Sequence, residues 1–170
     1  MNKEEIVMDG WHFLNSDYRL RYSDNRIVKP GEWVEMGSSI HPDLLGPELC
    51  LIGMHASSNL SDALLFLPSL RSYVLCRVSV KGDIVKGDDK FCGRFRKVLK
   101  WGDVNDGFGK FVYWAINTMD ADRNRIYDRI EHRPTRSFAW ASACLEELQD
   151  YPSYPRVMAK LMEYINPYLK

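Results

Sequence analysis

The stretch "SYVLCRVSVKGDIV", residues 72–85, decides the fold class of the first part of the chain. Two sets of side chains alternate along it: Tyr73, Leu75, Arg77 and Ser79 in one set, and Val74, Cys76, Val78 and Val80 in the other. Successive side chains of a strand point to opposite faces of a sheet, so this alternation predicts a strand. The following "KGDD", residues 86–89, is typical of a turn.

Other strand-like segments lie on both sides of this stretch. Residues 5–14 predict a first strand that is broken near Gly10, and residues 21–36 predict turn, strand, turn and strand. The segment "SSIHPDLLGPELC", residues 38–50, contains two prolines and a glycine and predicts a loop. Residues 50–57 suit a short buried strand, and residues 90–101 suit a further strand or a short helix.

Helical signals occur once in this part and dominate after residue 104. Asn59 or Ser61 is a candidate N-cap for a short helix that carries Leu64, Leu65 and Leu67. Apolar residues recur at helical spacing in residues 108–119 and 138–148, and a last helix is expected to open at Ser153 and Pro155. We therefore predict an α+β fold, strand-rich over about residues 5–100 and helical at the C-terminus. The expected parts are 1–104 and 105–170, packed as one domain.

Composition excludes some classes of function. Lys plus Arg and Asp plus Glu both total 23 among 170 residues, so the formal net charge is zero, which argues against nonspecific nucleic-acid binding. The N-terminus has no signal-peptide core, and no segment approaches the roughly 18 apolar residues that a membrane-spanning helix needs. We therefore expect a soluble, cytoplasmic protein without a membrane partner.

The four cysteines predict reduced thiols and no metal site. Cys50, Cys76, Cys92 and Cys144 are widely spaced, and no pair forms C-x-x-C. A zinc site needs paired ligands at short spacing, whereas only Cys50 and His55 lie near one another. Buried, reduced thiols are therefore the expected state.

His55 is the leading candidate site residue, because it lies between Met54 and Ala56 on an apolar strand. Burying a histidine is costly unless its ring nitrogens find partners. Three interpretations remain open: a hydrogen-bonded core histidine, a pocket residue at a strand end, or a metal ligand.

A second group of candidates lies around two turns and one strand. Asp88, Asp89 and Lys90 follow a predicted strand and form either a solvated turn or a site for a divalent ion or a ligand hydroxyl. His12 and Trp11 point to opposite faces of the first strand, so at most one of them lines a pocket. The basic run "RFRK", residues 94–97, is either a phosphate contact or a solvated face. No local catalytic motif accompanies these residues.

The order of these motifs resembles an uncharacterised family found in bacteriophages, prophages and bacteria. Its pattern runs C-x-x-G-[LM]-H-A-S, D-A-L, L-C-R-V and G-D-D-K, then a basic strand that ends in Leu-Trp and an Ala/Trp-rich tail. The matching positions here are Cys50, Gly53, His55, Ala56, Ser57, Asp62, Ala63, Leu64, Leu75, Cys76, Arg77, Val78, Gly87, Asp88, Asp89, Lys90, Leu99 and Trp101, with "FAWASA" at 138–143 as the tail. The resemblance covers roughly residues 10–145 and implies no established activity.

The middle of the chain also resembles the ADP-ribosyltransferase fold. That resemblance would place His12 at the histidine of the first strand and His55 where the fold usually has a tyrosine. It implies an NAD pocket, although the chain has no counterpart of the late-strand glutamate that serves transfer chemistry.

Two functions follow as hypotheses. The first is a phage-type accessory protein that binds a host or defence protein as an inhibitor, in the host cytoplasm and without a cofactor. The alternative is an NAD- or nucleotide-binding enzyme that uses the surroundings of His55 and Asp88–Lys90. Whether the chain is an enzyme stays open, because a site must be argued from its geometry.

Overall fold

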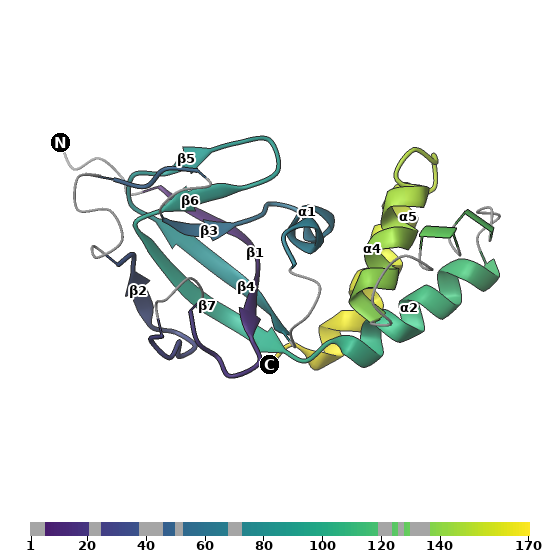
Figure 1. The fold of residues 1–170 in the computed structure, drawn as a ribbon, viewed down its shortest axis with the longest axis horizontal. Coiled ribbons are helices and arrows are strands. Elements are labelled where there is room, and N and C mark those ends of the chain that lie inside the picture. The colour runs from purple at the N-terminus through teal and green to yellow at the C-terminus, as the bar shows by residue number, and fades with distance from the viewer. Residues whose placement is uncertain are drawn as a thin grey trace. The chain divides into compact units, whose positions relative to one another are not determined.

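The computed structural model describes residues 6–20, 25–37, 46–49, 53–67, 73–118, 124–125, 128–129 and 137–170. The chain divides into two units, an N-terminal unit of Met1–Phe66 and Ser72–Trp101 and a C-terminal unit of Leu67–Arg71 and Gly102–Lys170. Strands make up most of the first unit and helices make up the second (Figure 1). The predicted α+β fold class is therefore confirmed.

Two antiparallel sheets form the N-terminal unit. The larger has the order β1-β4-β7-β2, built from β1 (Val7–Asn15), β4 (Tyr73–Lys81), β7 (Phe95–Gly102) and β2 (Trp33–Glu35). The smaller has the order β3-β6-β5, built from β3 (Met54–Ala56), β6 (Phe91–Gly93) and β5 (Val85–Lys86). Reciprocal backbone hydrogen bonds between Trp11 and Ser57, of 2.7 and 2.9 Å, join β1 to the end of β3. The two sheets therefore share one core.

The alternation along β4 is confirmed. Val74, Cys76, Val78 and Val80 all belong to the hydrophobic core of this unit, together with Leu14, Leu20, Val28, Met54, Ala56, Phe91 and Val98. On the other face, Leu75 is fully buried and Tyr73 nearly so. Central strands of a sheet covered on both sides carry apolar residues on both faces, and β4 fits this pattern.

Gly10 does not break the first strand, which corrects the sequence-based expectation. β1 continues through Gly10, which pairs with Val78 of β4. A Cβ atom at this position would lie 2.7 Å from the Ser57 carbonyl oxygen and 2.8 Å from Cζ of Phe91. The glycine therefore serves close approach of another strand and an aromatic ring.

Residues 90–101 form strands, which settles the alternative left open by the sequence. The segment becomes β6 and β7, separated by Arg94, whose backbone N–H donates to the Gly82 carbonyl oxygen at 2.8 Å. In residues 21–36, the described part contains β2 and an isolated bridge between Arg19 and Ile27. Most of the expected loop at 38–50 lies outside the described residues.

Asn59, one of the two expected caps, holds the N-cap position of the short helix α1 (Leu60–Leu65), but its side chain makes no capping hydrogen bond. The Asn59 side chain donates to Asp62 Oδ2 at 3.1 Å, and its carbonyl oxygen accepts from the N–H of Ala63. Leu60, Ala63 and Leu64 are buried. Leu65 is exposed, and Leu67 follows the helix, so only Leu64 of the three expected leucines is a buried helix residue.

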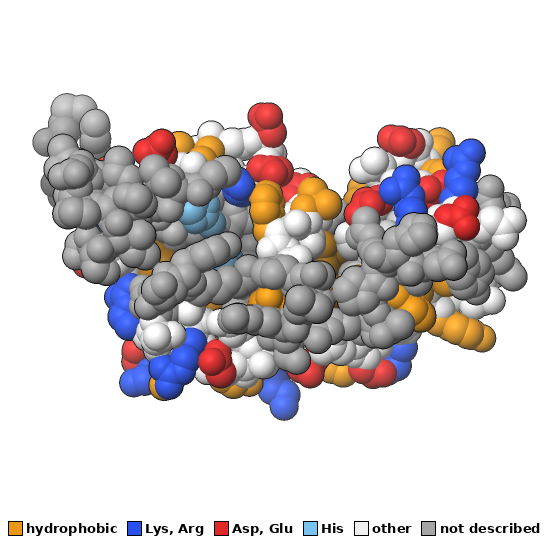
Figure 2. Space-filling model, viewed as in Figure 1, with side chains coloured by type: hydrophobic (Ala, Val, Ile, Leu, Met, Phe, Trp, Pro, Cys, Tyr) orange, Lys and Arg blue, Asp and Glu red, His pale blue; other side chains and the backbone are white. Residues whose placement is uncertain are grey.

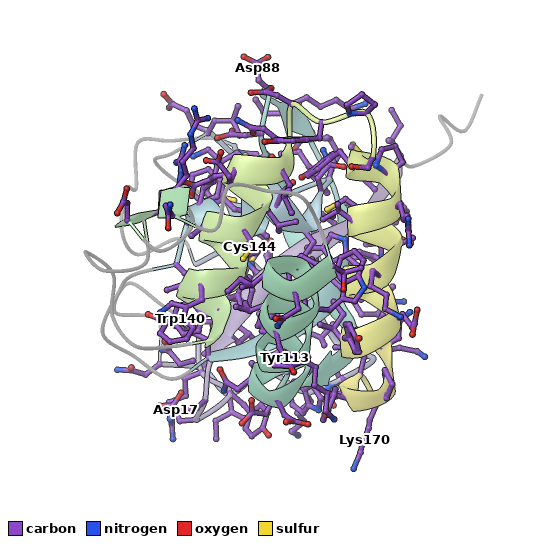
Figure 3. The ribbon with its side chains drawn as sticks, turned by 90° about the vertical axis from the view of Figure 1, so that its right-hand side faces the viewer. Asp17, Asp88, Tyr113, Trp140, Cys144 and Lys170 are labelled. Carbon is purple, nitrogen blue, oxygen red and sulfur yellow. The ribbon has the colours of Figure 1, made fainter. Side chains whose placement is uncertain are left out.

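Three helices and a short 3-10 helix dominate the described part of the C-terminal unit: α2 (Asn105–Thr118), α4 (Ser137–Leu148), α5 (Tyr154–Ile165) and η1 (Asn166–Tyr168). Ser153 is the N-cap of α5, as expected, and Val157, Leu161 and Ile165 are buried. Cys144 lies within this unit (Figure 3), where burial raises the pKa of its thiol to about 12. That thiol is therefore protonated at neutral pH.

An ion-pair network holds Arg125 and Arg129 to the end of α4. Arg129 donates to Glu147 and to Glu146, both at 3.1 Å, and Arg125 lies 3.5 Å from Glu147. The Ser142 hydroxyl donates to Glu146 at 3.1 Å. Glu147 is buried, so its two arginine partners offset the cost of removing the carboxylate from water. None of the described helices is long and apolar enough to cross a membrane.

Candidate functional site

His55 occupies the middle of β3, on the face opposite to the core. Its neighbours Met54 and Ala56 belong to the hydrophobic core, whereas His55 is half-buried. In the antiparallel pairing, Cys92 of β6 lies directly opposite His55. Side chains of directly opposite residues share one face, so His55 and the fully buried Cys92 are neighbours.

Arg96 supports β3 from the other sheet. It is 6% exposed, and its Nη1 donates to the backbone carbonyl oxygen of His55 at 2.8 Å. Along β7 it shares the face of the core residue Val98. A buried arginine therefore fixes the position of the His55 backbone.

The surroundings of His55 favour its neutral form. Burial is the largest cause that lowers the pKa of His55 from 6.5, and the charges of Arg96 and Lys90 lower it further. Hydrogen bonds to the backbone of Gly53 and Glu48 act in the opposite direction. The ring is therefore hydrogen-bonded, half-buried and in a positive local field, which is typical of a structural histidine or of the wall of an anion site.

The lowered pKa of His55 predicts a loss of stability in mild acid. Between its folded pKa and pH 6.5, the unfolded chain binds more protons at His55 than the folded protein, so stability falls as the pH drops through this window. Urea unfolding at a series of pH values should show this loss, and His55→Gln should remove it. Lys90→Gln should reduce this loss of stability, because it removes one of the charges that lower the pKa of His55. An unchanged slope of stability against pH in both variants would contradict the assignment.

The charge of Lys90, which follows Asp88 and Asp89 in the turn before β6, lowers the pKa of His55. The turn is closed by a 2.8 Å hydrogen bond from the Gly87 N–H to the Lys90 carbonyl oxygen, and Asp88 is exposed. Neither carboxylate is among the groups that shift the pKa of His55. Of the candidates in this turn, Lys90 is therefore the one whose charge contributes to the lowered pKa of His55.

Lys90 also borders an exposed apolar surface at the end of α1. Its Nζ lies 4.2 Å from the ring centroid of Phe66. Leu65 is 58% exposed and Phe66 is 39% exposed. Apolar side chains gather over α1 in Figure 2, with a Lys or Arg side chain beside them. Leu65, Phe66 and Lys90 together are called the α1 patch below.

His12 faces the other way from His55. It lies in β1 next to the core residue Leu14 on the same face, and it pairs with Cys76, which is also in the core. Its half-buried ring therefore lies on the core side of the larger sheet. Trp11, on the opposite face, is nearly buried beneath the Arg77 guanidinium, 5.0 Å from the ring centroid. The two histidines that the sequence singled out do not share a face.

No group of three or more His, Cys, Asp or Glu side chains that could hold a metal ion occurs among the described residues. Cys76, Cys92 and Cys144 are buried free thiols. Cys50, which the sequence placed near His55, lies outside the described residues.

Comparisons with family models, with curated proteins and with solved structures give no match. The fold itself places the chain in the α+β class, with one strand-rich unit and one helical unit. The resemblance to the phage and prophage family stays a prediction, and so does the NAD-linked alternative.

Sequence reasoning missed Arg96 and Cys92 as neighbours of His55. Alternation in "FRKV", residues 95–98, places Arg96 on the same face as Val98 and indicates that this one basic residue points inward. The pairing of His55 with Cys92 has no such signal, because register between strands far apart in sequence is set by tertiary contacts.

Proposed function

We propose that the chain acts by binding another protein, as a phage-type accessory protein that inhibits a host or defence protein in the cytoplasm. The observation that carries this proposal is the α1 patch, in which Leu65 and Phe66 are adjacent and exposed. Aromatic residues are enriched at protein interfaces, and an apolar centre bordered by charge is their usual anatomy. Lys90, 4.2 Å from the Phe66 ring centroid, supplies the charged border.

The buried side of α1 holds the α1 patch in a fixed position. Leu60, Ala63 and Leu64 are buried on one side of the helix, which leaves Leu65 on the exposed side. A partner that covers Leu65 and Phe66 therefore gains apolar burial, at roughly 25 cal/mol per Å², without reorganising the helix.

Placing a charge in the patch should weaken binding of the partner. Leu65→Lys leaves the buried face of α1 intact, so the protein should fold, whereas binding should weaken at least about tenfold because the lysine charge must be desolvated. Affinity capture from a bacterial host lysate, with the captured protein then purified and titrated against each variant, measures the effect.

Ile27→Lys is the matched control, because Ile27 is 57% exposed and Leu65 is 58% exposed. Both variants add one charge at an exposed aliphatic position of the N-terminal unit. The proposal requires Ile27→Lys to bind the captured protein like the unmodified chain. Equal binding by Leu65→Lys would refute a role for the α1 patch.

A further inference from the structure

The outer edge of β1 is left open over its first residues. β1 is an edge strand of the larger sheet and pairs with β4 along its whole length on one side. On its other side, the described residues give it one bridge, between Trp11 and Ser57. Val7 is 51% exposed and Asp9 is exposed, so the open part of this edge lies at the surface.

The backbone groups of Val7 and Asp9 point away from β4. Trp11 exchanges both of its backbone hydrogen bonds with Ser57, at 2.7 and 2.9 Å, so its N–H and carbonyl groups face the outer edge. These groups alternate in direction along an antiparallel strand, so those of Asp9 and Val7 face outward as well. Neither residue makes an outward backbone hydrogen bond to the part of the chain that the structure describes.

The chain leaves this edge directly after Ser57. Continuation of the antiparallel bridge would place Asn59 opposite Asp9. Asn59 instead holds the N-cap position of α1, where its carbonyl oxygen accepts a hydrogen bond from the Ala63 N–H. The position beside Asp9 and Val7 is therefore not filled by β3. A strand edge with unpaired N–H and carbonyl groups is a template for pairing with a further strand.

The side chains along the open edge favour a basic and an apolar neighbour. Among the described residues, Asp9 has one polar contact, in which its Oδ1 accepts a hydrogen bond from the Ser79 hydroxyl at 2.6 Å. Arg77 and Lys81, the cations on the same face of β4, instead lie over aromatic rings, 5.0 and 4.9 Å from the ring centroids. Val7 adds exposed apolar surface on that face. A basic residue opposite Asp9 and an apolar residue opposite Val7 would therefore stabilise an added strand.

We infer that β1 binds an extended segment of a partner protein as a further antiparallel strand at its outer edge. The open N–H and carbonyl groups carry partial charges complementary to those of an extended backbone, and main-chain hydrogen bonds give such strand addition its affinity. In the antiparallel register, the basic residue of the partner precedes its apolar residue by two positions. The edge shares no residue with the α1 patch, so this inference stands or falls independently of the function proposed above.

Titration of the isotope-labelled full chain with the capped peptide Thr-Lys-Thr-Val-Thr tests the inference by nuclear magnetic resonance. The amide signals of Val7 and Asp9 should shift, and their exchange with solvent should slow, because both N–H groups gain acceptors. Val7→Pro removes one outward donor and leaves the ladder to β4 intact, since proline is tolerated where an edge N–H faces away from the sheet. This variant should weaken binding at least about tenfold, with the Asp9 signal as the readout. Val7→Thr, the matched control, keeps the donor and should change the affinity less than about threefold.

Two further measurements complete the test. The peptide Thr-Glu-Thr-Val-Thr should bind at least about threefold more weakly, and Asp9→Asn should remove this difference, a comparison that does not depend on the folding of Val7→Pro. Undiminished binding by a folded Val7→Pro variant, or equal binding of the two peptides, would overturn the inference. Shifts at Val7 and Asp9 that grow with protein concentration alone would overturn it in favour of a second copy of the chain. No shift at millimolar peptide would overturn it in favour of an edge that is protected from pairing.

Discussion

Phe91→Ala should lower the free energy of unfolding of the N-terminal unit by about 3–5 kcal/mol, the range for removing a buried aromatic ring. Phe91 is 1% exposed and belongs to the hydrophobic core of this unit. Its ring also fills the space above Gly10, where a Cβ atom would lie 2.8 Å from Cζ. The substitution therefore opens a cavity where β1 and β6 meet.

Urea unfolding followed by circular dichroism measures this loss as a shift of the midpoint. Leu99→Ala is the control, because Leu99 lies on β7 of the same unit and is 39% exposed. Because Leu99 keeps 39% of its surface in water, its substitution should cost clearly less than that of Phe91, about 1–2 kcal/mol. A loss for Phe91→Ala no greater than that of the control would contradict the central position of the ring.

Gly10→Ala should destabilise the same unit by about 1–3 kcal/mol or more, because overpacking forces neighbouring atoms to move. The added methyl group would lie 2.7 Å from the Ser57 carbonyl oxygen, which is backbone, as well as against the Phe91 ring. The Trp11–Ser57 hydrogen bonds that join β1 to the end of β3 lie beside it. The strain therefore falls on the junction of the two sheets.

Gly46→Ala is the matched control for this prediction. A Cβ atom at Gly46 meets no atom of the described residues within 4 Å, so the substitution should leave stability unchanged or raise it by up to about 1 kcal/mol through the unfolded chain. Thermal unfolding of the two variants beside the unmodified chain gives the comparison. Equal midpoints for both variants would show that Ser57 and Phe91 do not approach Gly10 as described.

Much of the architecture could be predicted from local patterns. The alternation in residues 73–80 identifies β4, and apolar spacing together with Ser153 and Pro155 identifies α5, because these signals act within a few residues of one another. The same local reasoning failed at Gly10. A glycine inside a strand suggests a break, and only contacts with residues 57 and 91 reveal that close approach is the cause.

The candidate site was predicted less completely than the fold. His55 could be selected from the sequence because a histidine between apolar neighbours needs an explanation. The positive charge around His55 could not be predicted from the sequence, because Arg96 reaches His55 from another sheet and Lys90 reaches it from the turn before β6. His12 and His55 were candidates for one pocket, yet strand alternation turns one toward the core and the other away.

The sequence by itself determined the α+β class, the strand-rich first part and helical second part, and the alternation along β4. Each depends on residue spacing within one element, where periodicity and capping act. The tertiary structure alone decided that Arg96 supports His55, that Cys92 lies opposite it, and that Ser57 meets β1 at Trp11. These neighbours come from strands far apart in the chain, and their pairing register depends on the burial of a shared core, which no local pattern encodes.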